Sequence, residues 1–471
     1  MCLISAFASC EPEYERKTNL RFISLEDRKY QSYGENQFET TINYPNSEFM
    51  MKAEGPWFSR LRNILNGDPK VKQNDIRLES MVNFFDYDFP IVSPSEGLGV
   101  FSELSVCPWN EDHYLLMLAT KSSSIPMGQI PAVNFSFVID YTGSMGFEGR
   151  FEIAKQGMKD LVGKLRSNDR ISIITYGGDK LVWLPSTQVG NKQEVLASID
   201  ALNPTAENGK GDAVTEAYSQ IIPFLDPKGI NQIVVLTDGD PDIFESFQSS
   251  LRIIDENREG RVGFEIIGLG PSAYDYNTME KMGQLSGGQF RIVNNKSEWD
   301  KIFLNKLSDF YTTAIHLRGN ITFNDNWVKE YRLLGYEHRN DFESEFVEDA
   351  FIGTNFNSEE TNVVFYELKK DPDFAEGDIG VVSLRYTDLV NVNVEDKSIA
   401  IPSEVTPFAN CSEPFRFGSG VLTYGLQLKH SAHRGQANKD LAVSICLGAT
   451  VYDPGNHRKD WINTMQTVTP R

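Results

Sequence analysis

The feature that most constrains this chain is a series of short apolar strands that alternate with amphipathic helices between residues 131 and 313. The predicted strands are Val133–Asp140, Arg170–Tyr176, Gln232–Thr237 and Gly263–Gly268, and each is a continuous apolar stretch. Such strands belong to parallel sheets whose two faces are both covered by helices. The pattern therefore predicts an α/β fold with a doubly wound, mostly parallel sheet. Helices are expected to begin at Arg150, Lys192, Gly211 and Phe244, with a last one at Ser297–Thr313.

The segments on either side of this unit have a different character, and 471 residues are too many for one ordinary domain. Residues 11–55 are polar and lack a clear period, which is typical of a tether. Residues 56–130 contain a predicted helix, Trp57–Leu65, and a strand-like stretch, His113–Lys121, and are expected to form an N-terminal region of their own. Residues 314–471 are predicted to form a β-rich domain with helices at its end. Its expected elements are strands at Asn320–Phe323, Tyr331–Leu334, Asn362–Leu368, Gly380–Tyr386 and Lys397–Ile401, and helices within Phe415–Ala449.

The charge of the chain limits the partners that its surface can bind. The formal net charge is -21 and the isoelectric point is near 4.8. Because such a surface repels phosphates, nucleic acid and anionic lipid headgroups are not expected as partners. The sequence has no run of 18 or more apolar residues, so no membrane-spanning helix is expected either.

Oxygen-bearing side chains follow two of the predicted strands. Asp140, Thr142 and Ser144 occupy alternate positions of a glycine-containing loop, and Asp238 follows a later strand. The carboxyl ends of the strands form the ligand-binding edge of a doubly wound sheet. Carboxylates and hydroxyls without His or Cys suit Mg²⁺ or Mn²⁺ better than Zn²⁺. The alternative is that these residues only form turns, since Asp, Thr, Ser and Gly are common after strands.

The Asp140-x-Thr-x-Ser144 loop, with Asp238 in the later loop, resembles the metal-ion-dependent adhesion site of von Willebrand factor type A (VWA) domains. Thr142 stands where the family usually has Ser and keeps the hydroxyl. Asn208 falls where the family has Thr, and its amide oxygen would be the ligand there. In these sites a carboxylate of a protein partner fills the open metal position. The resemblance therefore implies a binding module, with a protein partner that offers an acidic residue.

The resemblance covers about residues 30 to 450. It extends to a group of bacterial cell-envelope lipoproteins that have a region before the VWA domain and a C-terminal domain of unknown function. Membership implies a membrane-anchored protein of the bacterial envelope. The segments that carry this wider resemblance are Tyr33–Phe38, Met81–Pro90, Cys107–Asn110, Tyr331–Arg339, Phe365–Leu368 and Phe415–Gly418.

Residues 1–10 are compatible with that location. They are apolar and end in Ala8-Ser9-Cys10, like the end of a lipoprotein signal, where small residues precede an acylated Cys. The usual basic segment is missing and the apolar run is short, so either the true start lies upstream or the match is chance. Cys10 is the predicted lipidation site, with residues 11–55 as the spacer.

The other cysteines carry no recognisable chemistry. Cys2, Cys107, Cys411 and Cys446 form no CxxC pair, with one another or with Cys10, so a zinc site or redox motif is not expected. The last three allow at most one disulfide, and buried free thiols are the simpler expectation.

Enzyme signatures are missing from the sequence. It has no HExxH, GxSxG or complete P-loop motif, and no GxGxxG after a first strand. A metal-dependent hydrolase using Asp140 and Asp238 is a weaker alternative, because no Arg or Lys stands out in either loop as a cationic clamp. A VWA scaffold that has lost its metal is a second alternative, for which Asn208 is the argument.

Overall fold

The computed structural model describes most of the chain and places Glu35–Arg471 in one compact unit. The residues described are 34–49, 55–67, 71–177, 181–204, 212–239, 262–272, 288–304, 307–337, 354–373 and 377–468, with single positions between 253 and 283. The helix expected at Phe244 and the predicted lipidation site Cys10 lie outside the described residues.

A six-stranded sheet forms the centre of an α/β unit that runs from residue 133 to residue 310. Its strands are β5 (Val133–Asp140), β6 (Arg170–Tyr176), β7 (Val182–Gln188), β8 (Ile230–Thr237), β9 (Val262–Leu269) and β10 (Phe290–Val293). Their order is β10-β9-β8-β5-β6-β7; neighbours pair in parallel, except that β7 is antiparallel to β6. The predicted doubly wound, mostly parallel sheet is confirmed, and its switch point lies between β5 and β8.

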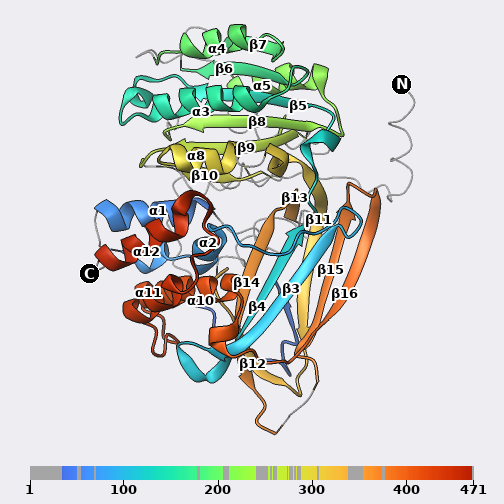
Figure 1. The fold of residues 1–471 in the computed structure, drawn as a ribbon, viewed down its shortest axis with the longest axis vertical. Helices are drawn as coiled ribbons and strands as arrows, with labels where there is room; N and C mark the ends of the chain where they lie inside the picture. The colour runs from blue at the N-terminus through green and yellow to red at the C-terminus, as the bar shows by residue number, and fades with distance from the viewer. Residues whose placement is uncertain are drawn as a thin grey trace. The chain divides into compact units, whose positions relative to one another are not determined.

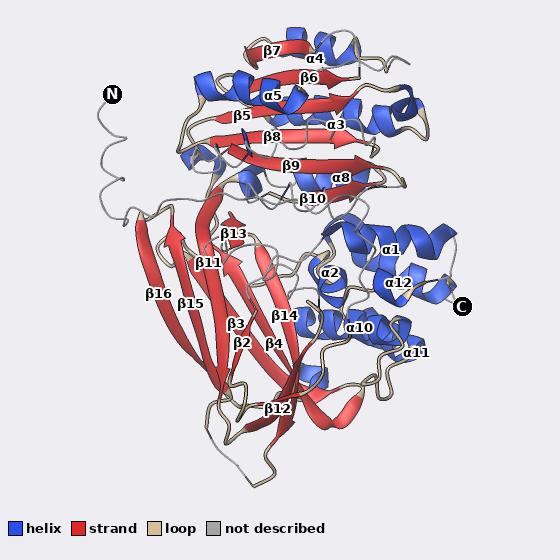
Figure 2. Ribbon diagram, turned by 180° about the vertical axis from the view of Figure 1, so that it is seen from behind, coloured by secondary structure: helices blue, strands red, loops and turns tan. Residues whose placement is uncertain are grey.

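Helices cover both faces of this sheet (Figures 1 and 2). They are α3 (Arg150–Lys164), α4 (Lys192–Asp200), α5 (Ala213–Ile221) and α8 (Lys296–Phe303). Side chains of α3, α4 and α8 share a core with one face, and those of α5 share a core with the other. Every residue of β5 and β8 is therefore buried, including the polar Asn134 and Ser136 of β5.

The last predicted helix of the unit is shorter than expected. The sequence pattern suggests Ser297–Thr313, but α8 ends at Phe303, and a 3-10 turn, η8 (Leu307–Phe310), precedes a strand that starts at Thr312. The apolar side chains Phe303, Leu307 and Phe310 all enter the core of the unit, so a helical spacing of buried residues continues across the break.

The remaining described residues form a β-sandwich covered by helices, here called the sandwich body. One sheet has the order β1-β12-β14-β4-β3 and the other β13-β11-β15-β16, with β2 beside β11, and the pairs are antiparallel. The strands are β1 (Glu39–Thr40), β2 (Asn46–Glu48), β3 (Leu98–Cys107), β4 (Asn110–Ser122), β11 (Thr312–Phe323), β12 (Val328–Leu333), β13 (Thr354–Asn357), β14 (Thr361–Lys370), β15 (Gly380–Asp388) and β16 (Asn393–Ile401).

The sandwich body joins segments that the sequence pattern separates. β4 pairs with β14 from Tyr114↔Leu368 to Lys121↔Thr361, so residues 56–130 and 314–471 share one sheet instead of forming separate regions. β1 and β2 also pair with β12 and β11, so the segment read as an irregular tether contributes two short strands. The α/β unit is an insertion between β4 and β11.

The sheet of the sandwich body that contains β4 and β14 is buried on both faces. Leu116 and Leu118 of β4 face the second sheet, whereas Leu115 and Met117 face a helical layer. That layer contains α1 (Gly55–Gly67), α2 (Leu78–Asn83), α10 (Glu413–Leu428), α11 (Lys439–Leu447) and α12 (His457–Thr467). The helix expected at Trp57–Leu65 lies within α1. Three thiols in this body, those of Cys107, Cys411 and Cys446, are buried and free.

Two glycines of α3 provide a test of this packing. A Cβ on Gly157 would lie 2.0 Å from a ring atom of the buried Trp299 of α8, whereas one on the exposed Gly163 would meet nothing within 4 Å. Gly157→Ala should lower the free energy of unfolding by about 1–3 kcal/mol through overpacking. Gly163→Ala should raise it by up to about 1 kcal/mol through helix propensity. Urea unfolding of both variants measures this, and equal effects would contradict the packing of α3 on α8.

Candidate functional site

The two loops with oxygen ligands meet at the switch point of the α/β sheet. Asp140 is the last residue of β5 and Thr237 the last of β8, and the register pairs Ile139 with Leu236 directly before them. The sequence after each strand is therefore brought to the same carboxyl-end edge, where doubly wound sheets bind ligands.

Asp140 is the centre of a hydrogen-bonded cluster of side chains. Its Oδ1 accepts from the backbone N–H of Thr142 at 3.1 Å and from the Thr142 hydroxyl at 2.6 Å. Its Oδ2 accepts from the Thr237 hydroxyl at 3.0 Å. The hydroxyl oxygens of Thr142 and Ser144 lie 3.0 Å apart. The structure thus brings together three of the five predicted site residues, Asp140, Thr142 and Ser144, and adds Thr237.

The environment of Asp140 opposes its ionisation. The side chain is 0% exposed, and burial raises the pKa of its carboxyl to about 6. The hydrogen bonds from Thr142 and Thr237 lower this pKa, while the neighbouring charge of Asp238 raises it. Among the described residues no Lys or Arg pairs with Asp140, so a negative charge here is stabilised by hydrogen bonds alone.

Asp238, by contrast with Asp140, has a cationic partner. It is also buried, but Arg150 Nη1 donates to its Oδ2 at 2.7 Å. The sequence shows no Arg or Lys within either loop, and the structure supplies this cation from α3 instead. Arg150 is six residues beyond Ser144 and is the first residue of α3, so only its place at a predicted helix start could have suggested it.

Asn208, the fifth predicted site residue, lies outside the described residues, between Pro204 and Asp212. The described chain resumes at Asp212, whose side chain caps α5 by accepting from the N–H of Thr215. The role implied for Asn208 stays a prediction.

The donor set at Asp140 fits a hard divalent cation. It has one buried carboxylate and two hydroxyls within hydrogen-bonding distance of one another, which are ligands that Mg²⁺ and Mn²⁺ accept. In the part of the chain that is described, no three His, Cys, Asp or Glu side chains gather as a metal site, so this set depends on the hydroxyls of Thr142 and Ser144. Asp238 fits less well as a direct ligand, because Arg150 already occupies one of its oxygens.

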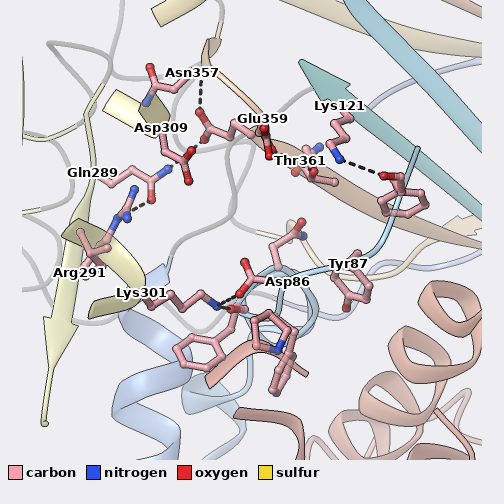
Figure 3. Close-up of a pocket in the computed structure, with 18 of the residues that line it drawn as sticks. Asp86, Tyr87, Lys121, Gln289, Arg291, Lys301, Asp309, Asn357, Glu359 and Thr361 are labelled. Atoms are coloured by element: carbon pink, nitrogen blue, oxygen red, sulfur yellow. Dashed lines mark hydrogen bonds and ion pairs between the residues drawn. The ribbon is translucent and has the colours of Figure 1, made fainter. Parts of the chain in front are cut away.

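A cavity of about 460 Å³ lies between the α/β unit and the sandwich body (Figure 3). Lys121 Nζ donates to the Phe89 carbonyl at 3.0 Å, and Lys301 Nζ donates to the Phe84 carbonyl and lies 3.4 Å from Asp86 Oδ2. These lysines fasten the segment after α2 to β4 and to α8. The Lys301 contacts therefore join the α/β unit to the sandwich body, whereas the Lys121 contact lies within the sandwich body.

Comparisons with known proteins agree with this architecture. The family model of the von Willebrand factor type A domain matches residues 134–310. Residues 134–310 are a VWA domain. A second model, described as von Willebrand factor, matches residues 24–117, and a third, described as the C-terminal part of the uncharacterized protein YfbK, matches residues 308–469.

Three relatives indicate how far the similarity extends. The uncharacterized protein YfbK of Escherichia coli (strain K12) is 26% identical over 93% of this chain and 80% of its own length. Inter-alpha-trypsin inhibitor heavy chain H2 of Homo sapiens is 24% identical over 41% of this chain but only 21% of its own length, so this chain spans about a fifth of it. The solved structure of a von Willebrand factor type A protein from Catenulispora acidiphila is 13% identical, with a TM-score of 0.44, over 82% of this chain and 92% of its own.

The raised pKa of Asp140 predicts a pH dependence that Asp140→Asn should remove. Because the folded-state pKa is about 6, above the usual aspartate value of 3.8, the contribution to stability is complete below pH 4 and is lost as pH rises through about 6. In EDTA, wild type should lose up to roughly 3 kcal/mol of unfolding free energy relative to Asp140→Asn across this range. Urea unfolding of both proteins between pH 4 and 8 measures it, and parallel profiles would contradict the assigned burial.

Proposed function

We propose that this protein is a non-enzymatic binding module whose VWA domain holds Mg²⁺ or Mn²⁺ at Asp140, Thr142 and Ser144. VWA domains are in general protein-interaction modules. The observation that supports the metal is the Asp140 carboxylate, which is fully buried beside two hydroxyls and pairs with no cation among the described residues. A divalent ion there would balance its charge.

The partner that suits this site is a protein with an exposed acidic residue. A bound metal would supply an open coordination position for that carboxylate. The chain itself carries a net charge of -21, so its surface repels an acidic partner in general. A local cation would be needed to reverse this repulsion, and binding should then depend strictly on the metal.

Two other functions are less well supported. A metal-dependent hydrolase would use Arg150 as a cationic clamp, but its guanidinium already donates to Asp238, Glu148 and the Pro271 carbonyl. A scaffold without metal is favoured by the same ion pair, since Arg150 already balances Asp238. The next experiment separates this scaffold from a metal-binding module.

Asp140→Asn should abolish the response of the protein to metal. In wild type, Mg²⁺ at a hundredfold excess over its Kd should add about 2.7 kcal/mol to the unfolding free energy relative to EDTA. Asp140→Asn should show no such gain and should lose partner binding, while its stability in EDTA at neutral pH should match or exceed that of wild type. Thermal melts with Mg²⁺ and with EDTA measure this.

Asp169 provides the matched control. It is a buried Asp at the amino end of β6, where it pairs with Arg166 at 2.9 Å and accepts from the Val133 N–H at 2.9 Å. Asp169→Asn should lower stability with and without metal and keep the metal response. If Mg²⁺ leaves the melting temperature of wild type unchanged, the proposed metal site is wrong. A metal-independent loss in Asp140→Asn as large as that in Asp169→Asn would make Asp140 a structural residue.

We further propose that the protein is anchored to the bacterial envelope through a lipid on Cys10, with the residues between Cys10 and the sandwich body as a spacer. In the described chain, no helix has the length and apolar character needed to cross a bilayer. Expressed from its native gene in a bacterial host, wild type should be found in the membrane fraction. Cys10→Ser should become soluble or unprocessed, and Cys2→Ser should behave as wild type. Wild type found wholly in the soluble fraction would contradict the anchor.

A further inference from the structure

The guanidinium of Arg150 connects three loops at the carboxyl end of the VWA sheet. Nη1 donates to Asp238 Oδ2 at 2.7 Å, in the loop after β8. Nη2 donates to Glu148 Oε2 at 3.0 Å, in the loop after β5, and to the Pro271 carbonyl at 3.1 Å, in the loop after β9. The side chain is only 12% exposed. Arg150 therefore occupies the same edge of the sheet as Asp140.

The backbone before α3 accounts for this position. Glu148 and Gly149 have φ of 56° and 70°, two consecutive residues in the left-handed region. Such a conformation is costly for Glu, and here it turns the chain so that the first side chain of α3 folds back over the site. The guanidinium packs closely against Gly270, where a Cβ would lie 3.3 Å from Arg150 Nε.

One donor of Arg150 is left without a partner. Nε is buried and makes no hydrogen bond among the described residues. A buried N–H without an acceptor is unfavourable. The position of the guanidinium is therefore not explained by the hydrogen bonds of its own N–H groups. The ion pair with Asp238 compensates for the unsatisfied Nε. Without it, Asp238 would be a buried, unpaired carboxylate beside Asp140, which would cost more free energy than the unsatisfied N–H.

The two aspartates of the site thus differ in the charge of their partners. Asp238 has a permanent positive partner, whereas Asp140 has only hydrogen bonds from Thr142 and Thr237. We infer that Arg150 is the internal counter-cation of this site: it keeps Asp238 from binding the metal directly, weakens the affinity for divalent ions, and holds the metal-free loops together. This inference rests on the proposed metal site at Asp140.

The physical basis is the charge that a metal would meet. With Arg150 in place the two carboxylates and the guanidinium sum to one negative charge, and without it they sum to two. Affinity for hard cations rises with the number of charged ligands, and nearby charges are weakly screened in a buried site. In the absence of metal, however, the two carboxylates would repel each other, so the same change should destabilise the folded protein.

Arg150→Met tests this, because Met is unbranched and fills space but carries no charge. Mn²⁺ binding by calorimetry should be tighter than in wild type by about tenfold or more. The melting temperature in EDTA should be lower than that of wild type. Arg150→Lys, which retains a positive charge, should have an affinity closer to that of wild type.

Lys155→Met is the matched control on the same helix. Lys155 Nζ donates to the carbonyls of Asp200 and Leu202 at 2.8 and 2.7 Å, away from the site. This variant should lose stability without changing Mn²⁺ affinity. The double variant Arg150→Met/Asp238→Asn should recover stability in EDTA relative to Arg150→Met, because it removes the unpaired charge.

The outcomes separate the inference from the proposed function. If wild type binds Mn²⁺ and a folded Arg150→Met binds it equally or more weakly, Arg150 positions a ligand and the inference is wrong, although the metal site stands. If Arg150→Met binds and wild type does not, Arg150 has taken the place of the metal and the inference is supported. If both proteins fold and neither binds Mn²⁺, the proposed metal site itself is wrong, and the inference falls with it.

Discussion

The antiparallel pairing of β4 with β14 is the interaction on which the arrangement of this protein depends. It joins the segment before the VWA domain to the segment after it, while the domain itself is inserted between β4 of this sheet and β11 of the second sheet. The VWA domain is held at a second point as well, where Arg62 of α1 forms an ion pair with Glu298 of α8. The inserted domain is held at its ends and along α8. These attachments do not involve the loops at the carboxyl ends of its strands, so those loops are available for binding. The proposed metal site consequently lies in loops that begin at strands of the packed sheet.

The sequence predicted the VWA sheet well, because its signals are local. β5 and β6 begin and end where the apolar runs do, since each run is long enough to bury one strand on both faces. The pairing of β4 with β14 has no such signal. Strand partners separated by a whole domain are chosen by shape and burial in the finished core, which a period-two pattern cannot encode. For the same reason β1, a two-residue strand, could not be distinguished from an irregular tether.

The candidate site was predictable to the extent that its residues are close in sequence or end a strand. Asp140, Thr142 and Ser144 lie at the end of β5 and in the loop after it, and Asp238 directly follows the neighbouring strand β8, so strand order alone brings the two loops to one edge. Arg150 was not predicted as a site residue. Its side chain reaches Asp238 because two residues before α3 have left-handed backbone angles. Glycine at position 149 permits such a turn, but Glu148 gives no indication of it.

Three buried aspartates at the ends of the VWA strands show how a fold divides structural from functional charge. Asp169 and Asp238 each lie within hydrogen-bonding distance of an Arg, as a buried carboxylate requires if it is to remain ionised in a stable core. Asp140 has no such partner among the described residues, and its pKa is raised to about 6. If the only role of this carboxyl were structural, we would expect either a cation paired with it or an amide side chain in its place. An acid retained without a counter-ion is consistent with a positive charge that comes from outside the chain, and the hydroxyls of Thr142 and Ser144 beside it are the reason that a hard metal ion is proposed for that charge.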